Sequence, residues 1–142
     1  MNIGKLLLWI AGIALIFGGG YAAAVYVGDT PSYTLTAVKA GENKETSATL
    51  HNGEHQAELD TMLNILLHQK PMEGASVDME NPDVTLKLIS PERSIGILDA
   101  RVWFEEDRAV LGIRSGQTWN SIRFSELSQN EASYIRSIVG EE

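Results

Sequence analysis

Residues 84–114 read "VTLKLISPERSIGILDARVWFEEDRAVLGIR", and this stretch decides the fold. Apolar and polar side chains alternate over 84–89, 98–104 and 109–114, which is the period of two of a half-buried β-strand. The connections "SPERSIGI" and "EEDR" between these runs are rich in turn-forming residues. A further alternating run, 119–124, follows the turn "SGQT". Because the four runs are short and closely spaced, they predict an antiparallel meander.

Two other segments have the 3.6-residue period of an amphipathic helix. The first covers about 55–69, where apolar side chains recur at i, i+3, i+4 and i+7 as Leu59, Met62, Leu63 and Leu66. The second follows Ser128, which has capping-box spacing to Glu131, and its apolar face continues up to Gly140. The sequence therefore predicts one helix before the meander and one at the carboxyl end.

The expected fold class is α+β. Alternating runs at 33–38 and 44–50, with turn residues at 40–43 between them, predict a β-hairpin ahead of the first amphipathic helix. The element order is then hairpin, helix, four-stranded meander and carboxyl-terminal helix. We expect one antiparallel sheet with both helices on a single face, and we expect 72–83 to be a surface connection.

The amino-terminal segment predicts a transmembrane helix. No charged residue occurs from Leu6 to Gly28, a run of 23 residues, and a helix of that length covers a hydrocarbon core of about 30 Å. The small residues at Ala22 and Ala24 also fit a signal-peptide cleavage site after Ala24. Since the apolar run continues past that site, we favour an uncut anchor over 1–28 and an extracytoplasmic domain over 29–142.

The flanks of this segment predict its orientation. Lys5 precedes the apolar run and Asp29 follows it, so the positive-inside rule places the amino terminus in the cytoplasm and the domain outside. The predicted location is the cell membrane, crossed once. Within the anchor, Ala14, Gly18 and Ala22 stand at i, i+4 and i+8, a small-residue ladder that could pack two anchors into a homodimer.

Composition excludes several classes of function. The chain has no cysteine, which excludes disulfides, thiolate metal sites, a cysteine nucleophile and a lipidated cysteine. All 19 acidic residues and 10 of the 11 basic ones follow Val27, so that portion carries 10 minus 19, or −9. Such a field repels nucleic acid and anionic lipid surfaces. No cofactor and no nucleic-acid partner are predicted.

The strand alternation also separates two sheet faces. If the apolar residues, with Ile122 and Phe124 among them, face the helices, a cluster of cations and indoles occupies the other face: Lys87, Arg101, Trp103, Arg114, Trp119 and Arg123. Tryptophan and arginine are enriched at binding hot spots, so this face is the predicted contact for an envelope protein or an anionic cell-wall component. The alternative is that Arg101 and Lys87 only pair across strands with Asp99 and Glu105. A register shift of one residue would disperse the cluster.

A second candidate site is His51, Glu54 and His55, which form H-x-x-E-H. This order resembles that of one family of zinc proteases, in which two histidines bind the metal and the glutamate is the base. That chemistry needs all three groups on one helical turn, but Asn52 and Gly53 interrupt the motif with turn residues. A metal-binding protein or hydrolase is therefore an alternative only, and no catalytic residue is predicted.

The order of elements supports a resemblance over about 45–139. The segments that carry it are "ELDTMLNILLHQKP", "VTLKLIS", "GILDARVWFEEDRAVLGIR" and "ELSQNEASYIRSIV". This pattern resembles small extracytoplasmic domains on lipoproteins and membrane-anchored proteins of Gram-positive bacteria, most of them without an assigned function. The resemblance implies a compartment and a fold but no active site. Unlike the lipoprotein members, the chain lacks a lipobox cysteine, which leaves the helix as its means of attachment.

Taken together, these observations predict a single-pass, non-catalytic binding or regulatory module of the cell envelope. Besides the metal or hydrolase alternative, a structural tether that oligomerises through its anchor also fits the sequence.

Overall fold

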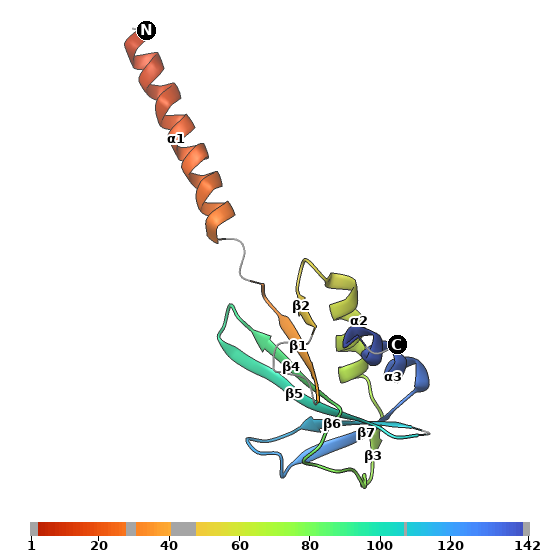
Figure 1. Cartoon of the computed structure of the whole chain (residues 1–142). Coiled ribbons are helices and arrows are strands. Elements are labelled where there is room, and N and C mark those ends of the chain that lie inside the picture. Colours follow the sequence, from red (N-terminus) through yellow and green to blue (C-terminus); the bar gives the residue numbers. More distant parts are fainter. Residues whose placement is uncertain (1–2, 28–30, 41–47, 107, 141–142) are drawn as a thin grey trace. The chain divides into compact units, whose positions relative to one another are not determined.

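The computed structural model describes residues 3–27, 31–40, 48–106 and 108–140. The chain divides into two compact units, Met1–Thr30 and Pro31–Glu142. The first unit contains helix α1 (Ile3–Val27), and the second contains a β-sheet with two further helices (Figure 1).

Helix α1 is 25 residues long and has no acidic residue in its first turn. Several of its described side chains are large, apolar and exposed: Trp9, Ile10, Ile13, Leu15, Ile16, Phe17 and Tyr21. Of the predicted small-residue ladder, Ala14 and Gly18 are exposed, and the side chain of Ala22 lies outside the described residues. Within the part of the chain that the structure describes, no helix has the combined length and hydropathy that a membrane crossing requires.

The sheet has seven strands in the order β2-β1-β4-β5-β6-β7-β3. All six neighbouring pairs are antiparallel. The strand bounds are β1 (Thr34–Lys39), β2 (Thr49–His51), β3 (Pro71–Met72), β4 (Val84–Ser90), β5 (Ile95–Phe104), β6 (Ala109–Arg114) and β7 (Ile122–Leu127). The predicted α+β class with an antiparallel sheet is therefore confirmed.

The predicted hairpin and meander form one continuous sheet, because β1 pairs with β4 through six residue pairs from Thr34–Ile89 to Lys39–Val84. The short strand β3, which was not predicted, adds to the far edge beside β7. The last strand of the meander begins at Ile122 instead of residue 119. The reason is the preceding turn, in which Ser115 N donates to Ser121 O at 2.9 Å.

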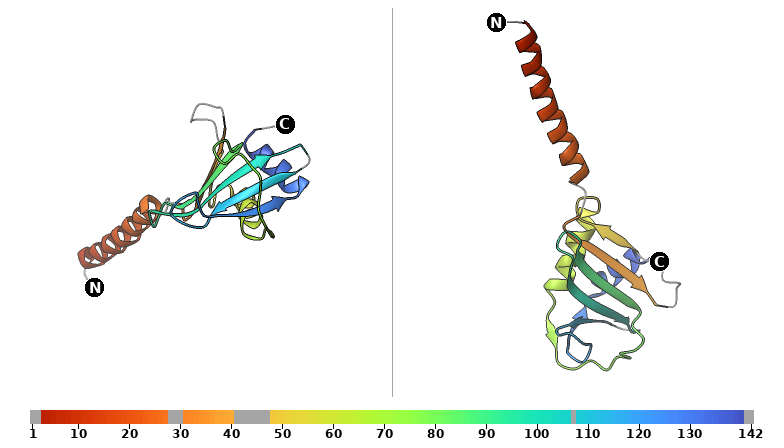
Figure 2. Two further views of the ribbon diagram at one scale, coloured as in Figure 1. Left: turned by 90° about the horizontal axis from the view of Figure 1, so that it is seen from below. Right: turned by 90° about the vertical axis from the view of Figure 1, so that its left-hand side faces the viewer.

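Helices α2 (Gln56–Leu67) and α3 (Gln129–Ile138) lie on one face of the sheet (Figures 1 and 2). The side chains that they bury are Leu59, Met62, Ile65 and Leu66 from α2 and Ala132 and Ile135 from α3. These side chains share one core cluster with the inward residues of the strands, among them Leu35, Leu86, Ala100, Val102 and Leu111. The predicted capping box at the start of α3 is present. The face opposite the helices is called the outer face below.

Candidate functional site

Four of the six predicted contact residues occur on the outer face. The core residues Ala100 and Val102 assign the inward positions of β5, so Arg101 and Trp103 point outward. In β4, Lys87 is opposite Asp99, which lies on the same face as Arg101. Arg114 is the residue after the inward Ile113 in β6 and also faces outward.

Arg123 does not belong to this cluster, and its predicted position is wrong. In the register of β6 and β7, Arg123 is opposite Ile113, which is part of the core, so Arg123 lies on the helix side of the sheet. Ile122 and Phe124 face outward instead. Within β7, Ile122 and Phe124 point to one face of the sheet and Leu127 points to the other, so the sequence alone does not assign the inward face. Leu127 is buried opposite Ala109, which makes its side the inward one. The inward and outward positions of β7 are thus shifted by one residue from those predicted, and this shift removes Arg123 from the cluster.

Trp103 lies on the predicted face but is not available for contact, because it is only 4% exposed. Its indole Nε1 donates to the backbone oxygen of Asp78 at 2.7 Å, so the connection between β3 and β4 packs over it. Val110 beside it is also buried, and neither residue belongs to the main core cluster. Together with Phe124, whose ring centroid is 6.1 Å from that of Trp103, they form a small second core on the outer face.

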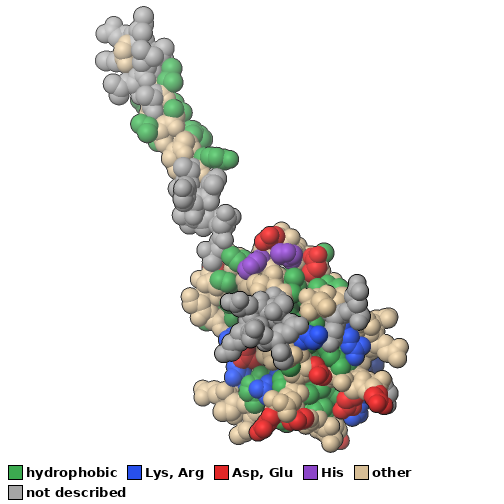
Figure 3. Space-filling model, viewed as in Figure 1, with side chains coloured by type: hydrophobic (Ala, Val, Ile, Leu, Met, Phe, Trp, Pro, Cys, Tyr) green, Lys and Arg blue, Asp and Glu red, His purple; other side chains and the backbone are tan. Residues whose placement is uncertain are grey.

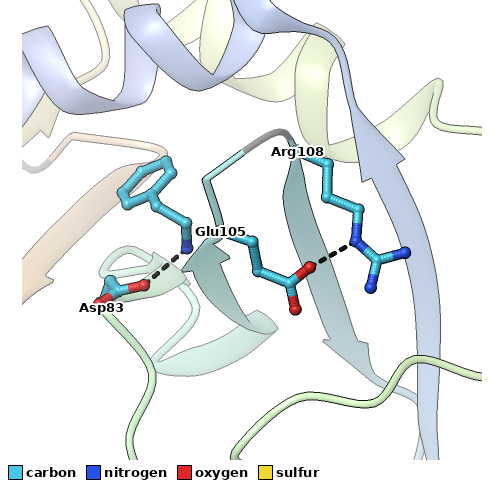
Figure 4. Close-up of polar contacts among 4 residues, drawn as sticks. Asp83, Glu105 and Arg108 are labelled. Carbon is cyan, nitrogen blue, oxygen red and sulfur yellow. Dashed lines mark hydrogen bonds and ion pairs between the residues drawn. The ribbon is translucent and has the colours of Figure 1, made fainter.

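The connection 73–83 is held in place by several polar contacts. Arg101 Nη1 donates to Met79 O at 2.7 Å. Asn81 Nδ2 and Glu80 N donate to the carboxylate of Asp78, and these hydrogen bonds lower the pKa of Asp78. At the end of the connection, the Asp83 carboxylate accepts a hydrogen bond from Phe104 N at 2.6 Å (Figure 4). The predicted surface connection is therefore a fixed cover over the outer face.

Trp119 belongs to the contact cluster even though it lies in a turn and not on a strand. The guanidinium carbon of Arg101 is 3.9 Å from the centroid of the Trp119 ring, and that of Arg114 is 5.8 Å away. Both distances are within the range of cation–π contacts. The turn between β6 and β7 thus brings Trp119 back over β5.

The acidic residues Asp99 and Glu105 do not pair with Arg101 and Lys87, as the alternative prediction had it. Asp99 forms an ion pair with Arg114, and Glu105 forms one with Arg108 at 2.5 Å (Figure 4). Lys87 stands opposite Asp99 in the sheet register. No hydrogen bond or ion pair links Lys87 to any residue that the structure describes.

A cavity of about 710 Å³ opens at the end of the sheet where Lys87, Asp99 and Arg114 meet. Its apolar lining includes Ile89, Ile95 and Ile97. The side chains of Ile95 and Ile97 are 50% and 44% exposed. We refer to this space, with its charged and apolar lining, as the Lys87 cavity.

A β-bulge shapes the Lys87 cavity. The register of β4 and β5 shifts between Leu88 and Ile89, so that Ile89 is opposite Gly96. A Cβ added at Gly96 would meet no atom within 4 Å, so the space above it is open. This site is absent from the predictions made from sequence, which place "SPERSIGI" in a turn. The alternation in Ile95-Gly96-Ile97 was the available indication that β5 begins earlier.

The histidine motif is brought together only in part. His51 ends β2, His55 is the N-cap residue of α2, and their ring centroids are 6.4 Å apart, whereas Glu54 lies in the turn between them. His51 Nδ1 is 3.2 Å from Thr34 Oγ1, and the buried His55 Nδ1 has no hydrogen-bond partner among the described residues. Histidine and acidic side chains share the end of the domain in Figure 3. The described residues contain no group of three or more ligands placed for a metal ion.

Comparisons of this chain with protein-family models, with curated proteins and with solved structures found no match. The resemblance to extracytoplasmic domains of Gram-positive bacteria therefore stays an expectation from the sequence pattern.

Proposed function

We propose that this chain is a non-catalytic binding module that is held at the cell membrane by its amino-terminal helix and contacts an anionic or protein partner outside the cell. The observation that carries the proposal is the Lys87 cavity, which combines cationic and apolar groups on the outer face. The proposed contact residues are Lys87, Arg101, Arg114 and Trp119. Trp103 and Arg123 are no longer part of the proposed surface.

Charge supports an anionic partner. The chain has a net charge of −8, so an anion is repelled from most of its surface. In the Lys87 cavity Arg114 neutralises Asp99, and the ammonium of Lys87 has no partner among the described residues. An anion that enters the cavity therefore gains a charge-assisted hydrogen bond without displacing an existing ion pair.

The stacked arrangement of Arg101 on Trp119 supports a preformed surface. The guanidinium of Arg101 is held by two contacts, since its Nη1 donates to Met79 O and its carbon lies over the Trp119 ring. Because these side chains are already ordered, a partner that contacts them loses less conformational entropy on binding. Arginine and tryptophan in such a setting are typical of the centre of an interface.

Attachment to the membrane is supported by the full sequence of the amino-terminal segment. The uncharged run from Leu6 to Gly28 lies almost entirely within α1, whose 25 residues correspond to about 37 Å of helix at the usual rise per residue. The exposed apolar side chains described in α1 keep half or more of their surface open to solvent. A bilayer would remove them from water.

The attachment is tested by expressing the full chain and extracting membranes with alkaline carbonate. We expect the protein to stay in the membrane fraction and the domain to be cleaved by protease added outside the cell. Release of the intact chain by carbonate would refute the anchor.

Binding is tested with the full chain, immobilised in detergent, and solubilised cell-envelope fragments. We expect Lys87→Glu to lower the amount of captured envelope material severalfold, because it reverses the charge in the cavity. Lys70→Glu is the matched control, since Lys70 is also exposed but does not line the cavity. Equal capture by both variants and the wild type would refute the proposed surface.

A further inference from the structure

The Lys87 cavity combines an ammonium that no described residue neutralises with an apolar wall. This combination indicates the chemistry of its ligand. We propose that the cavity binds the carboxyl terminus of a peptide whose last residue is aliphatic. The inference rests on the proposed binding function, and it adds the class of ligand to it.

The charged side of the cavity fits a single carboxylate. Lys87 offers three N–H donors, none used by a described residue. Arg114 already donates to Asp99 and, through Nη1, to Gln117 O at 3.3 Å, so its planar group is held in a fixed orientation. A monoanion beside Lys87 completes the charge balance of the three side chains, whereas a dianion would leave excess negative charge next to Asp99.

The apolar side of the cavity fits an aliphatic side chain close to that carboxylate. Ile95 and Ile97 are about half exposed, and Ile89 lines the same space. Covering them removes apolar surface from water. Since both isoleucines remain open to solvent, the cavity does not enclose its ligand, and a long alkyl chain would extend into water. A leucine or isoleucine side chain next to the carboxylate would contact them.

Gly96 gives the ligand backbone room to approach the sheet. It lies opposite Ile89 at the bulge, and no heavy atom is within 4 Å of the position that its Cβ would take. A glycine within a strand marks sites where another backbone comes close. A side chain introduced at this position would enter the cavity without a clash and without a positive φ.

The ligand class is tested by fluorescence anisotropy with the full chain in detergent and short amino-terminally labelled peptides. The sequences Ala-Ala-Leu with a free carboxylate, Ala-Ala-Leu-amide and Ala-Ala-Ser with a free carboxylate separate the two requirements. We expect Ala-Ala-Leu to bind about tenfold more tightly than its amide, which lacks the charge, and severalfold more tightly than Ala-Ala-Ser. Equal binding of the carboxylate and the amide would overturn the proposal.

Three variants and one control locate the binding in the cavity. We expect Lys87→Glu and Lys87→Gln to weaken the binding of Ala-Ala-Leu about tenfold, and Lys70→Glu to leave it unchanged. We expect Gly96→Val to abolish binding by filling the space, while its thermal unfolding stays at or above that of the wild type because valine favours strands. Unchanged binding to Gly96→Val would overturn the proposed location.

Two further outcomes separate this inference from the function on which it rests. Octanoate that displaces the peptide at equal concentration would identify a fatty acid instead of a peptide terminus as the ligand. Capture of envelope material that depends on Lys87, together with no binding of any of the peptides, would overturn the ligand class and leave the binding module in place.

Discussion

Gly112 lies against the indole ring of Trp103. A Cβ built on Gly112 would come within 2.8 Å of Trp103 Cζ3 and 3.1 Å of Ile122 Cγ2. The first distance is shorter than carbon atoms tolerate and the second is tight, so β6 needs a glycine where the indole crosses it. On the same ring, the indole Nε1 donates to Asp78 O in the connection 73–83.

We predict that Gly112→Ala destabilises the domain. The added methyl group must displace the Trp103 ring or the strand, and overpacking of this kind costs about 1–3 kcal/mol of the free energy of unfolding. Urea denaturation followed by tryptophan fluorescence measures the change. Gly96→Ala is the matched control, since its Cβ meets nothing within 4 Å. A Gly112→Ala variant as stable as this control would show that the indole is not packed as described.

Replacing Trp103 with phenylalanine should loosen the cover of the outer face. Phenylalanine cannot donate to Asp78 O, and a lost buried hydrogen bond costs about 1–3 kcal/mol. We expect faster proteolysis within 73–83 as well as lower stability. Trp119→Phe is the control, because Trp119 is only partly buried and no hydrogen bond links its indole to a described residue. Equal proteolysis of the two variants would contradict this role of Trp103.

Much of the fold could be predicted from local patterns. The period of two identified β4, β5 and β6, and the period of 3.6 identified α2, because each pattern has one clear phase. The capping box at Ser128 marked the start of α3 correctly. In β7 the pattern did not predict the inward face, because Ile122 and Phe124 indicate one face and Leu127 indicates the other. Only the pairing with β6 selects between them.

The candidate site was predictable only where it depends on strand phase. Lys87, Arg101 and Arg114 were placed on the outer face correctly, since their neighbours in sequence are core residues. The burial of Trp103 was not predictable, because it depends on a connection whose path is set by tertiary contacts. The cavity at Gly96 depends on a β-bulge, which the local sequence does not specify.

Asp83 joins the cover of the outer face to the end of β5. Its carboxylate accepts from Phe104 N at 2.6 Å (Figure 4), and its own N–H donates to Val102 O at 2.9 Å. We predict that Asp83→Ala lowers the free energy of unfolding by about 1–2 kcal/mol, because Phe104 N loses a charge-assisted hydrogen bond. Hydrogen exchange of the Phe104 amide should become faster. An unchanged exchange rate would mean that this bond does not protect the strand end.

Glu131 links α3 to Ser128 and to Gln69, which lies just after the end of α2. Its carboxylate accepts from Ser128 N at 2.8 Å, Ser128 Oγ at 2.7 Å and Gln69 Nε2 at 2.7 Å. Burial is the largest single influence and raises the pKa of Glu131, but the hydrogen bonds from Ser128 and Gln69 together outweigh it and lower the pKa. The ionised form is therefore favoured in the folded state.

We predict that part of the stability of the domain is lost as the pH falls below 4.5, the ordinary value for a glutamate. Because the pKa of Glu131 is lower in the folded state, the unfolded chain binds the proton first, so the stabilisation is fully present at higher pH and disappears as the pH falls through the folded value. Urea denaturation between pH 7 and pH 3 measures this dependence.

Glu131→Gln should be less stable than the wild type at pH 7, and the difference in the free energy of unfolding should narrow at acid pH. Ser128→Ala, which costs about 0.5–2 kcal/mol as a lost cap, should flatten the same pH dependence, because it removes the hydroxyl that holds the carboxylate. A Glu131→Gln variant whose stability falls with pH as steeply as that of the wild type would show that another group is responsible.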